Sequence, residues 1–208
     1  MTEPDSSSLK LIGGWLCLDF INTVDCRNSD HLRENLSTYQ GLVSWSQHAN
    51  ILTEDEARDM LREATLHPAN AKIILERAIT IREALYQIFS AIANHHPPSA
   101  ANINTLNMEM SIAMAQMHLK PMGVTDPWKY TFEDVKLDRM LWFIIHSATE
   151  LLTSDKLDRV CECQGENCGW LFLDMSRNRS RKWCDMKDCG NRAKAQRHYQ
   201  ITRAKHSQ

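Results

Sequence analysis

The 208-residue chain lacks the features that direct a protein across or into a membrane. Its first ten residues, MTEPDSSSLK, contain neither the basic stretch nor the apolar stretch of a secretory signal. No apolar run approaches the roughly 18 residues that a membrane-spanning helix needs, and the run MLWFII stops at His146. We therefore expect a cytoplasmic protein with no membrane partner, whose thiols stay reduced. Residues 1–8 are polar and read as a frayed tail.

The chain also lacks the motifs of common catalytic and nucleotide-binding sites. It contains no P-loop, no dinucleotide-binding glycine fingerprint, no G-x-S-x-G and no H-E-x-x-H. A polar cluster near the start, formed by Asp19, Asn22, Thr23 and Asp25, is more typical of a helix cap or turn than of a ligand site. We expect that the protein is not an enzyme.

Cysteine is present in an odd number, seven, which argues against a framework in which every cysteine forms a disulfide. Cys163 and Cys168 form one C-x4-C pair, and Cys184 and Cys189 form another. Structural zinc commonly takes four tetrahedral ligands as two such short-loop pairs. The sequence therefore predicts one structural zinc ion, with no open position for water or substrate. Cys161 could replace Cys163 as the first ligand, but the equal loop lengths favour Cys163.

Charge is distributed unevenly, although the formal net charge is only −2. Residues 176–208 contain ten Lys or Arg and two Asp or Glu, whereas the preceding 175 residues contain 14 basic and 24 acidic residues. This asymmetry indicates an acidic body with a basic, polyanion-seeking appendage. Four thiolates around a zinc dication carry a net −2, which would need only two or three of the ten basic residues.

Two stretches of this basic segment carry residue types that contact phosphates and bases. One lies between the cysteine pairs, and the other is the start of a helix expected from about Asn191. The candidate nucleic-acid-binding residues are Arg177, Asn178, Arg179, Arg181, Lys182, Asn191, Arg192, Lys194 and Arg197.

The hydrophobic pattern predicts a mainly α fold with a few short strands. Apolar residues three or four apart predict helices over 70–94 and 137–153, and a Met-rich helix is expected over 102–118. Capping-box patterns at Ser37 with Gln40 and at Thr53 with Glu56 predict two further helix starts. Turn residues between short apolar runs predict a hairpin in 118–132. The Met-rich stretch 108–122 is expected to belong to the core rather than to a partner surface. The segment LIGGWLCLDFINTV fits either a short helix or a buried strand.

Two segments resemble known families. The stretch CGWLFLDMSRNRSRKWCDMKDCGNRAKAQRHY resembles the CGNR zinc finger, whose name stands here as Cys189-Gly190-Asn191-Arg192. GGWLCLDFINT resembles the start of the ABATE domain, a family of stress-induced transcription regulators. The resemblance implies a mostly helical bacterial protein with a treble-clef-like zinc module that binds DNA. It also implies Cys163, Cys168, Cys184 and Cys189 as zinc ligands; Cys161 departs from the family pattern.

Together these observations predict two parts: a mostly helical body over 1–155, and a CGNR-type zinc module over 156–208 followed by a basic helix. We expect the module to bind duplex DNA, and the body to bind a small effector or a second copy of the chain. Two alternatives remain open at this point. The same module could bind RNA, or it could be a protein-interaction module whose basic face meets an acidic partner.

Overall fold

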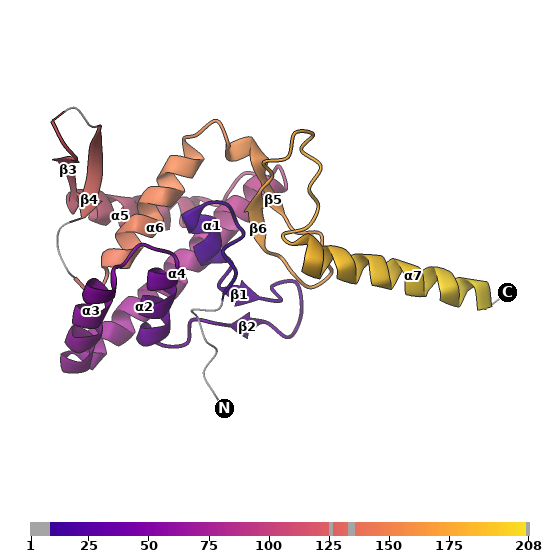
Figure 1. Ribbon diagram of the computed structural model, residues 1–208, viewed down its shortest axis with the longest axis horizontal. Helices are drawn as coiled ribbons and strands as arrows, with labels where there is room; N and C mark the ends of the chain where they lie inside the picture. Colours follow the sequence, from indigo (N-terminus) through magenta and orange to yellow (C-terminus); the bar gives the residue numbers. More distant parts are fainter. Residues whose placement is uncertain (1–8, 125–126, 133–135, 207–208) are drawn as a thin grey trace.

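The chain forms a mainly helical body, a small cysteine-rich module and one long projecting helix (Figure 1). The computed structural model describes residues 9–124, 127–132 and 136–206. It confirms the predicted fold class, with helices throughout and only short antiparallel strands. No helix among these residues is both long and apolar enough to cross a bilayer. The tail expected at residues 1–8 lies outside the described residues.

Within the described residues, six α-helices build the body, and their apolar faces meet in one core. They are α1 Leu16–Ile21, α2 Tyr39–His48, α3 Glu54–Leu66, α4 Pro68–Ala93, α5 Ala100–Ala115 and α6 Arg139–Leu152. Helices α4 and α6 confirm the two clearest periodic segments, because the apolar residues of each are buried along one face. The N-terminal segment that fits helix or strand forms the short helix α1.

The starts of α2 and α3 test the two capping-box patterns. At α3 the prediction is confirmed, because Thr53 accepts from the Glu56 N–H while Glu56 accepts from the Thr53 N–H. At α2 the prediction is wrong. Thr38, one residue after Ser37, is the cap and accepts from the Gly41 N–H at 3.0 Å. Because Gly41 has no side chain to reach back, the reciprocal half of the box cannot form.

The described strands pair as three short antiparallel hairpins. They are β1 Val24–Asp25 with β2 Arg33–Glu34, β3 Met117–Pro121 with β4 Trp128–Phe132, and β5 Val160–Glu162 with β6 Leu171–Leu173. The second pair confirms the hairpin predicted in 118–132. The expectation that the Met-rich stretch is core is wrong for Met108, Met114 and Met122, which are exposed. The helix α5 ends at Ala115, and its outer side faces solvent.

Strand β6 belongs to two cores at once. Its side chains alternate, so that Leu171 and Leu173 lie in the large core of the body while Phe172 lies in the small core around Cys163 and Cys184. A sequence boundary near residue 155 therefore does not separate two independent cores. The division into 1–155 and 156–208 stays a prediction about function.

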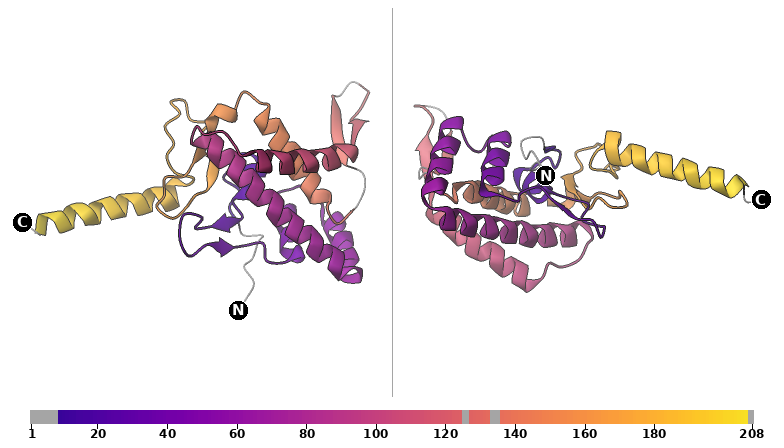
Figure 2. Two further views of the ribbon diagram at one scale, coloured as in Figure 1. Left: turned by 180° about the vertical axis from the view of Figure 1, so that it is seen from behind. Right: turned by 90° about the horizontal axis from the view of Figure 1, so that it is seen from below.

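The cysteine-rich module ends in a helix that leaves the molecule. A short 3-10 turn, η2 Leu157–Arg159, precedes β5, and a π-helical turn, η3 Met186–Gly190, leads directly into α7 Asn191–His206. Figure 2 shows that α7 points away from the body in both views, with the C-terminus at the far end. From Asn191 to Gln200 its side chains are exposed except for Ala193, which is half-buried. This confirms the helix predicted from about Asn191.

Candidate metal centre and nucleic-acid interface

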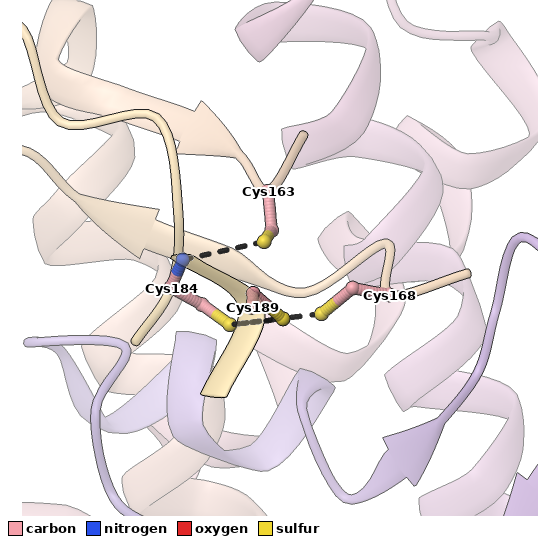
Figure 3. Close-up of side chains that lie close together, drawn as sticks. All are labelled: Cys163, Cys168, Cys184 and Cys189. Carbon is pink, nitrogen blue, oxygen red and sulfur yellow. Dashed lines mark hydrogen bonds between the residues drawn. The ribbon is translucent and has the colours of Figure 1, made fainter. Parts of the chain in front are cut away.

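Four cysteine sulfurs converge at the junction of the module and α7 (Figure 3). The Sγ atoms of Cys163, Cys168, Cys184 and Cys189 all lie within 4.8 Å of one another. Cys184 Sγ is 3.6 Å from Cys168 Sγ and 3.7 Å from Cys189 Sγ. A tetrahedral zinc ion with Zn–S bonds of about 2.3 Å places its sulfurs about 3.8 Å apart, whereas a disulfide needs about 2.0 Å. The donor set and its spacing fit one structural zinc ion. Cys161 is not in the group, whereas Cys163 is.

Local backbone structure brings the two pairs together. Cys163 directly follows β5, and its N–H donates to the Trp170 carbonyl at 2.8 Å, which extends the β5–β6 ladder by one residue. The N–H groups of Gly165 and Cys184 donate to Cys163 Sγ at 3.4 and 3.3 Å. Cys189 lies in η3, just before the N-terminus of α7. One pair therefore lies in the connection of a β-hairpin, and the last cysteine lies at the start of a helix.

The thiols perturb one another strongly. Hydrogen bonds from Cys168 and Cys184 lower the pKa of Cys163, because they stabilise its thiolate. The pKa of Cys184 is raised, first by its hydrogen bond to Cys163 and then by the one to Cys168. Four thiolates this close are stable only around a cation, and a bound zinc dication supplies that charge. The positive N-terminal end of α7 lies beside the site and offsets the remaining negative charge.

Each residue of the tetrapeptide at 189–192 has a structural task. Cys189 supplies a sulfur, and a Cβ on Gly190 would lie only 2.5 Å from Met186 Sδ, so no larger residue fits there without a shift. Asn191 donates through Nδ2 to the Lys187 carbonyl at 3.0 Å. Arg192 donates through Nη2 to Cys189 Sγ at 3.1 Å, and this bond raises the pKa of Arg192. Two predicted nucleic-acid contacts, Asn191 and Arg192, thus also hold the metal centre.

Arg181, another predicted contact, is directed into the module. Its guanidinium donates to the carbonyls of Leu173 at 3.3 Å and Trp183 at 3.0 Å, and also to that of Cys184. The same group lies 4.2 Å from the centroid of the Phe172 ring. These contacts join β6 to the second cysteine pair, which makes Arg181 a structural residue of the zinc module.

Asp174 organises the basic loop between the two pairs. Its buried carboxylate accepts from the N–H groups of Ser176 and Arg181, both at 2.8 Å. At the loop tip, Arg179 pairs with Asp158 at 2.5 Å. Sequence reasoning missed Asp174, although an Asp two residues before a Ser is a common signal for a turn closed by a side chain.

The body contacts the loop of the first cysteine pair directly. The Arg27 N–H donates to the Cys168 carbonyl at 3.2 Å, and the Arg27 guanidinium pairs with Glu83 of α4 at 2.7 Å. Gly169 has φ +68°, and a Cβ there would lie 2.8 Å from Arg27 Cβ, so both its conformation and its space require glycine. The Trp170 indole donates to the Val24 carbonyl at 2.9 Å. These contacts bring the β1–β2 hairpin against the zinc loop.

Asn22 makes the closest link between body and module. Its side chain donates to the Leu171 carbonyl at 2.8 Å and accepts from the Leu171 N–H at 2.9 Å. Asn22 therefore continues the hydrogen bonding of strand β6 from inside the body. Its neighbour Thr23 donates to the Phe20 carbonyl, Asp19 accepts from Gly13, and Asp25 pairs with Arg33. The polar cluster is thus occupied with structural contacts, as its turn-like pattern predicts.

A groove of about 1150 Å³ lies between the first half of α7, the zinc loops and the β1–β2 hairpin. Arg192, Gln196 and Arg197 line it from α7, and His31 and Arg33 line it from the body. Five predicted contacts are exposed and make no side-chain bond to any residue within 9–124, 127–132 or 136–206: Arg177, Asn178, Lys182, Lys194 and Arg197. These are the groups available to a ligand.

The sequence analysis did not identify two lysines that lie near the candidate interface. Lys187 in η3 is exposed and has no such side-chain bond within the described residues. Lys10 pairs with Asp185 at 2.7 Å and also with Asp188, the two acidic residues of the basic segment. These pairs raise the pKa of Lys10, first through Asp185. Because Lys10 offsets part of the negative charge of these two acids, the exposed cations around them meet less opposing charge.

Comparison with known proteins gives two family matches. Residues 14–155 match the ABATE family, described as "Putative stress-induced transcription regulator", and residues 159–201 match the CGNR zinc finger. Neither is an enzyme family. No curated protein matches the chain. The second match spans the four cysteines, Asp174 and most of α7, and the first spans the helical body.

Proposed function

Since the chain belongs to the ABATE family and carries a CGNR zinc finger, we propose that it regulates transcription by binding duplex DNA through residues 156–208. One zinc ion, bound by the four cysteines, keeps the module folded. The body, residues 1–155, binds a small effector or a second copy of the chain. The family description supports a role in the response to stress, and we place that role in the bacterial cytoplasm.

The observation that carries the proposal is a set of exposed cations that make no side-chain bond to another described residue. Arg177 and Lys182 lie on the loop that Asp174 holds, and Lys194 and Arg197 lie on α7. Such cations are available to phosphates, which supply most of the affinity of DNA-binding proteins. Lys187 adds a fifth such charge between the loop and the helix.

The shape of α7 supports duplex DNA as the ligand. An α-helix with its side chains is about 10–12 Å across, and the major groove of B-DNA is about 12 Å wide. Helix α7 projects from the body (Figure 1), so the body does not obstruct its approach. Asn178 on the loop is the residue best placed to add a base contact. Asn191 and Arg192 at the helix start use one donor each at the metal centre and add contacts through their remaining polar atoms. Arg179 and Arg181 contribute by shaping the loop.

Fluorescence anisotropy with a labelled random duplex and the full zinc-loaded chain tests the proposal. The full chain is needed because the module shares β6 with the body. We expect the logarithm of the affinity to fall linearly with the logarithm of the salt concentration, because each phosphate contact releases counterions. The triple variant Arg177→Gln/Lys182→Gln/Arg197→Gln should flatten this slope by about 2.7, at about 0.9 for each lost contact.

The matched control replaces three exposed body cations, as Arg58→Gln/Arg62→Gln/Lys72→Gln, and should leave the slope unchanged. Zinc content, measured for each variant, separates lost contacts from a lost fold. If the wild-type chain binds no duplex at low salt, DNA binding is excluded. If it binds structured RNA more tightly than duplex DNA at equal salt, the polyanion is RNA. If it binds neither, the basic face serves a protein partner.

A further inference from the structure

The β3–β4 hairpin is amphipathic along its whole length. On one face the cross-strand pairs are Met117–Phe132, Leu119–Tyr130 and Pro121–Trp128, all apolar or aromatic. On the other face they are His118–Thr131 and Lys120–Lys129, all polar. Side chains of a strand alternate between its two faces, so this pattern predicts that one face of the hairpin contacts water (the wet side) and that the other is covered by apolar atoms (the dry side).

Only the inner end of the dry side is covered. Phe132 is 3% exposed and packs against α6, with its ring centroid 4.7 Å from that of Phe143. Farther out, Leu119 is 58%, Tyr130 57% and Trp128 64% exposed. Figure 1 shows the hairpin extending past the ends of α5 and α6. An isolated two-stranded hairpin is only marginally stable in water, so the outer half gains stability if something covers its apolar face.

The exposed apolar surface continues onto the body. Met114 of α5, half exposed, lines a small apolar cavity together with Met117, Phe132 and His146. The Tyr130 ring lies 5.5 Å from the His146 ring. The only charged residue of α5, Glu109, is bound to Arg77 and is mostly buried. We define the hairpin surface as Met114, Leu119, Pro121, Trp128 and Tyr130; none of these side chains carries a charge.

We propose that the hairpin surface is the contact between two copies of this chain. A two-fold contact places a surface against itself, so an uncharged apolar surface meets another with no charge left unpaired. Elsewhere the first 175 residues carry ten more acidic than basic residues, and copies meeting through those faces would repel each other. The charged residues Lys120 and Lys129 lie on the opposite face of the hairpin, so they do not enter the contact.

The two copies pack face to face rather than edge to edge. The hairpin edges carry Lys120, Lys129 and Pro121, which are the residue types that block the addition of another strand. The area also suits a dimer. A buried aromatic side chain hides about 150–250 Å², so Trp128 and Tyr130 offer roughly 100 Å² each at their exposure, and Leu119 and Met114 add roughly 50 Å² each.

This gives roughly 300 Å² of apolar area on each copy. Because interfaces are only about 57% apolar, the whole contact covers about 500 Å² or more per copy, or about 1,000 Å² for the pair. That lies at the lower limit for a specific interface and predicts a dimer of moderate affinity. The contact is independent of whether the zinc module binds DNA.

Sedimentation equilibrium of the full zinc-loaded chain, over about 1–100 µM protein, tests the proposal. We expect a reversible monomer–dimer equilibrium. Trp128→Glu places a charge at the centre of the contact and should raise the dissociation constant at least about tenfold. Leu66→Glu is the matched control, because Leu66 is equally exposed on α3 and lies outside the hairpin surface; it should leave the dissociation constant unchanged.

Hydrogen exchange at low and high protein concentration provides a second measurement on the unaltered chain. The amides of β3 and β4 should exchange more slowly at high concentration, while those of α3 should not change. A wild-type chain that stays monomeric over the whole range overturns the proposal. So does a Trp128→Glu variant that keeps a wild-type melting temperature and dimerises as tightly as wild type.

Discussion

Arg181 and Asp174 hold the loop between the cysteine pairs from inside. The Arg181 guanidinium binds three backbone carbonyls, and Asp174 accepts two backbone N–H groups. Burial raises the pKa of Asp174, but hydrogen bonds from Ser176 and Arg181 outweigh it, so the pKa lies below its usual value. The loop is therefore shaped before any ligand arrives, which lowers the entropy lost on binding.

We predict that Asp174→Ala destabilises the protein by about 3 kcal/mol or more, because it removes two hydrogen bonds to a charged acceptor and each contributes about 1.5–3 kcal/mol. Two N–H groups lose their acceptor, and amides 175–181 should exchange faster with solvent. Urea denaturation and hydrogen exchange measure the two effects. Asp155→Ala is the control, since Asp155 is exposed. If both variants unfold at the same urea concentration, Asp174 does not organise the loop.

At this scale the sequence predicts residue types but not side-chain directions. Spacing predicts the two cysteine pairs, because two short pairs have few ways to surround one metal. The grouping of Cys163 rather than Cys161 with the other three sulfurs is visible only in the folded chain. Arg177 and Arg181 belong to the same SRNRSRKW run, yet Arg177 is exposed and Arg181 faces Phe172. The difference comes from the fold of the loop around Asp174, which no local pattern of charges encodes.

Among the elements, α7 differs from the body helices. It is polar on nearly all sides, and in its first two turns Arg192 binds Cys189 and Gln196 binds Glu166. An isolated helix of this length is marginal in water. We therefore expect its C-terminal half to fray in solution and to become fully helical on DNA.

This expectation makes glycine at position 200 informative, as Gln200→Gly compared with Gln200→Ala. Glycine in a helix interior costs about 1 kcal/mol relative to alanine, so DNA affinity should fall about fivefold if DNA binding completes the helix. Zinc content and melting temperature should not change, because Gln200 is exposed and lies in the half of α7 that we expect to be frayed in the free protein. Ala101→Gly, at an exposed position of α5, is the control, and anisotropy measures both. Equal affinities for the two variants would mean that α7 does not take part in binding.

Helices and strands with a strong hydrophobic period were predictable from the sequence. Features that depend on contacts with residues far away in the sequence were not. The patterns of α4, α6 and the β3–β4 hairpin repeat over enough residues to identify the element. Ser37 and Thr38 are equally good caps by type, and only the position of Gly41 in the folded helix separates them. The Met residues of α5 read as core because methionine usually is, yet α5 lies at the surface and only its inner side is covered.

The whole molecule depends on contacts between residues far apart in sequence. Asn22 binds both backbone groups of Leu171, and the Leu173 N–H donates to the Gly13 carbonyl at 2.8 Å. Local patterns cannot reveal such pairs, which is why the sequence suggests a boundary near residue 155 and the folded chain shares β6 across it. The zinc site and the core of the body are therefore joined by one strand.

From this junction we predict that zinc removal destabilises the body as well as the module. Chelation removes the metal from the small core that contains Cys163, Cys184 and Phe172. Strand β6 then packs against only the core of the body, and its contacts with α1 and the β1–β2 hairpin weaken. Because a structural zinc ion contributes several kcal/mol or more, and about 1 kcal/mol shifts the melting temperature of a chain this size by about 2–4 °C, the transition should fall by about 10 °C or more. Hydrogen exchange should speed up at 16–25 and 159–190 but not in β3–β4, which lies at the far end of the body (Figure 1). Confinement of the change to 159–190, with an unchanged melting temperature for the body, would show that the two parts fold independently despite their shared strand.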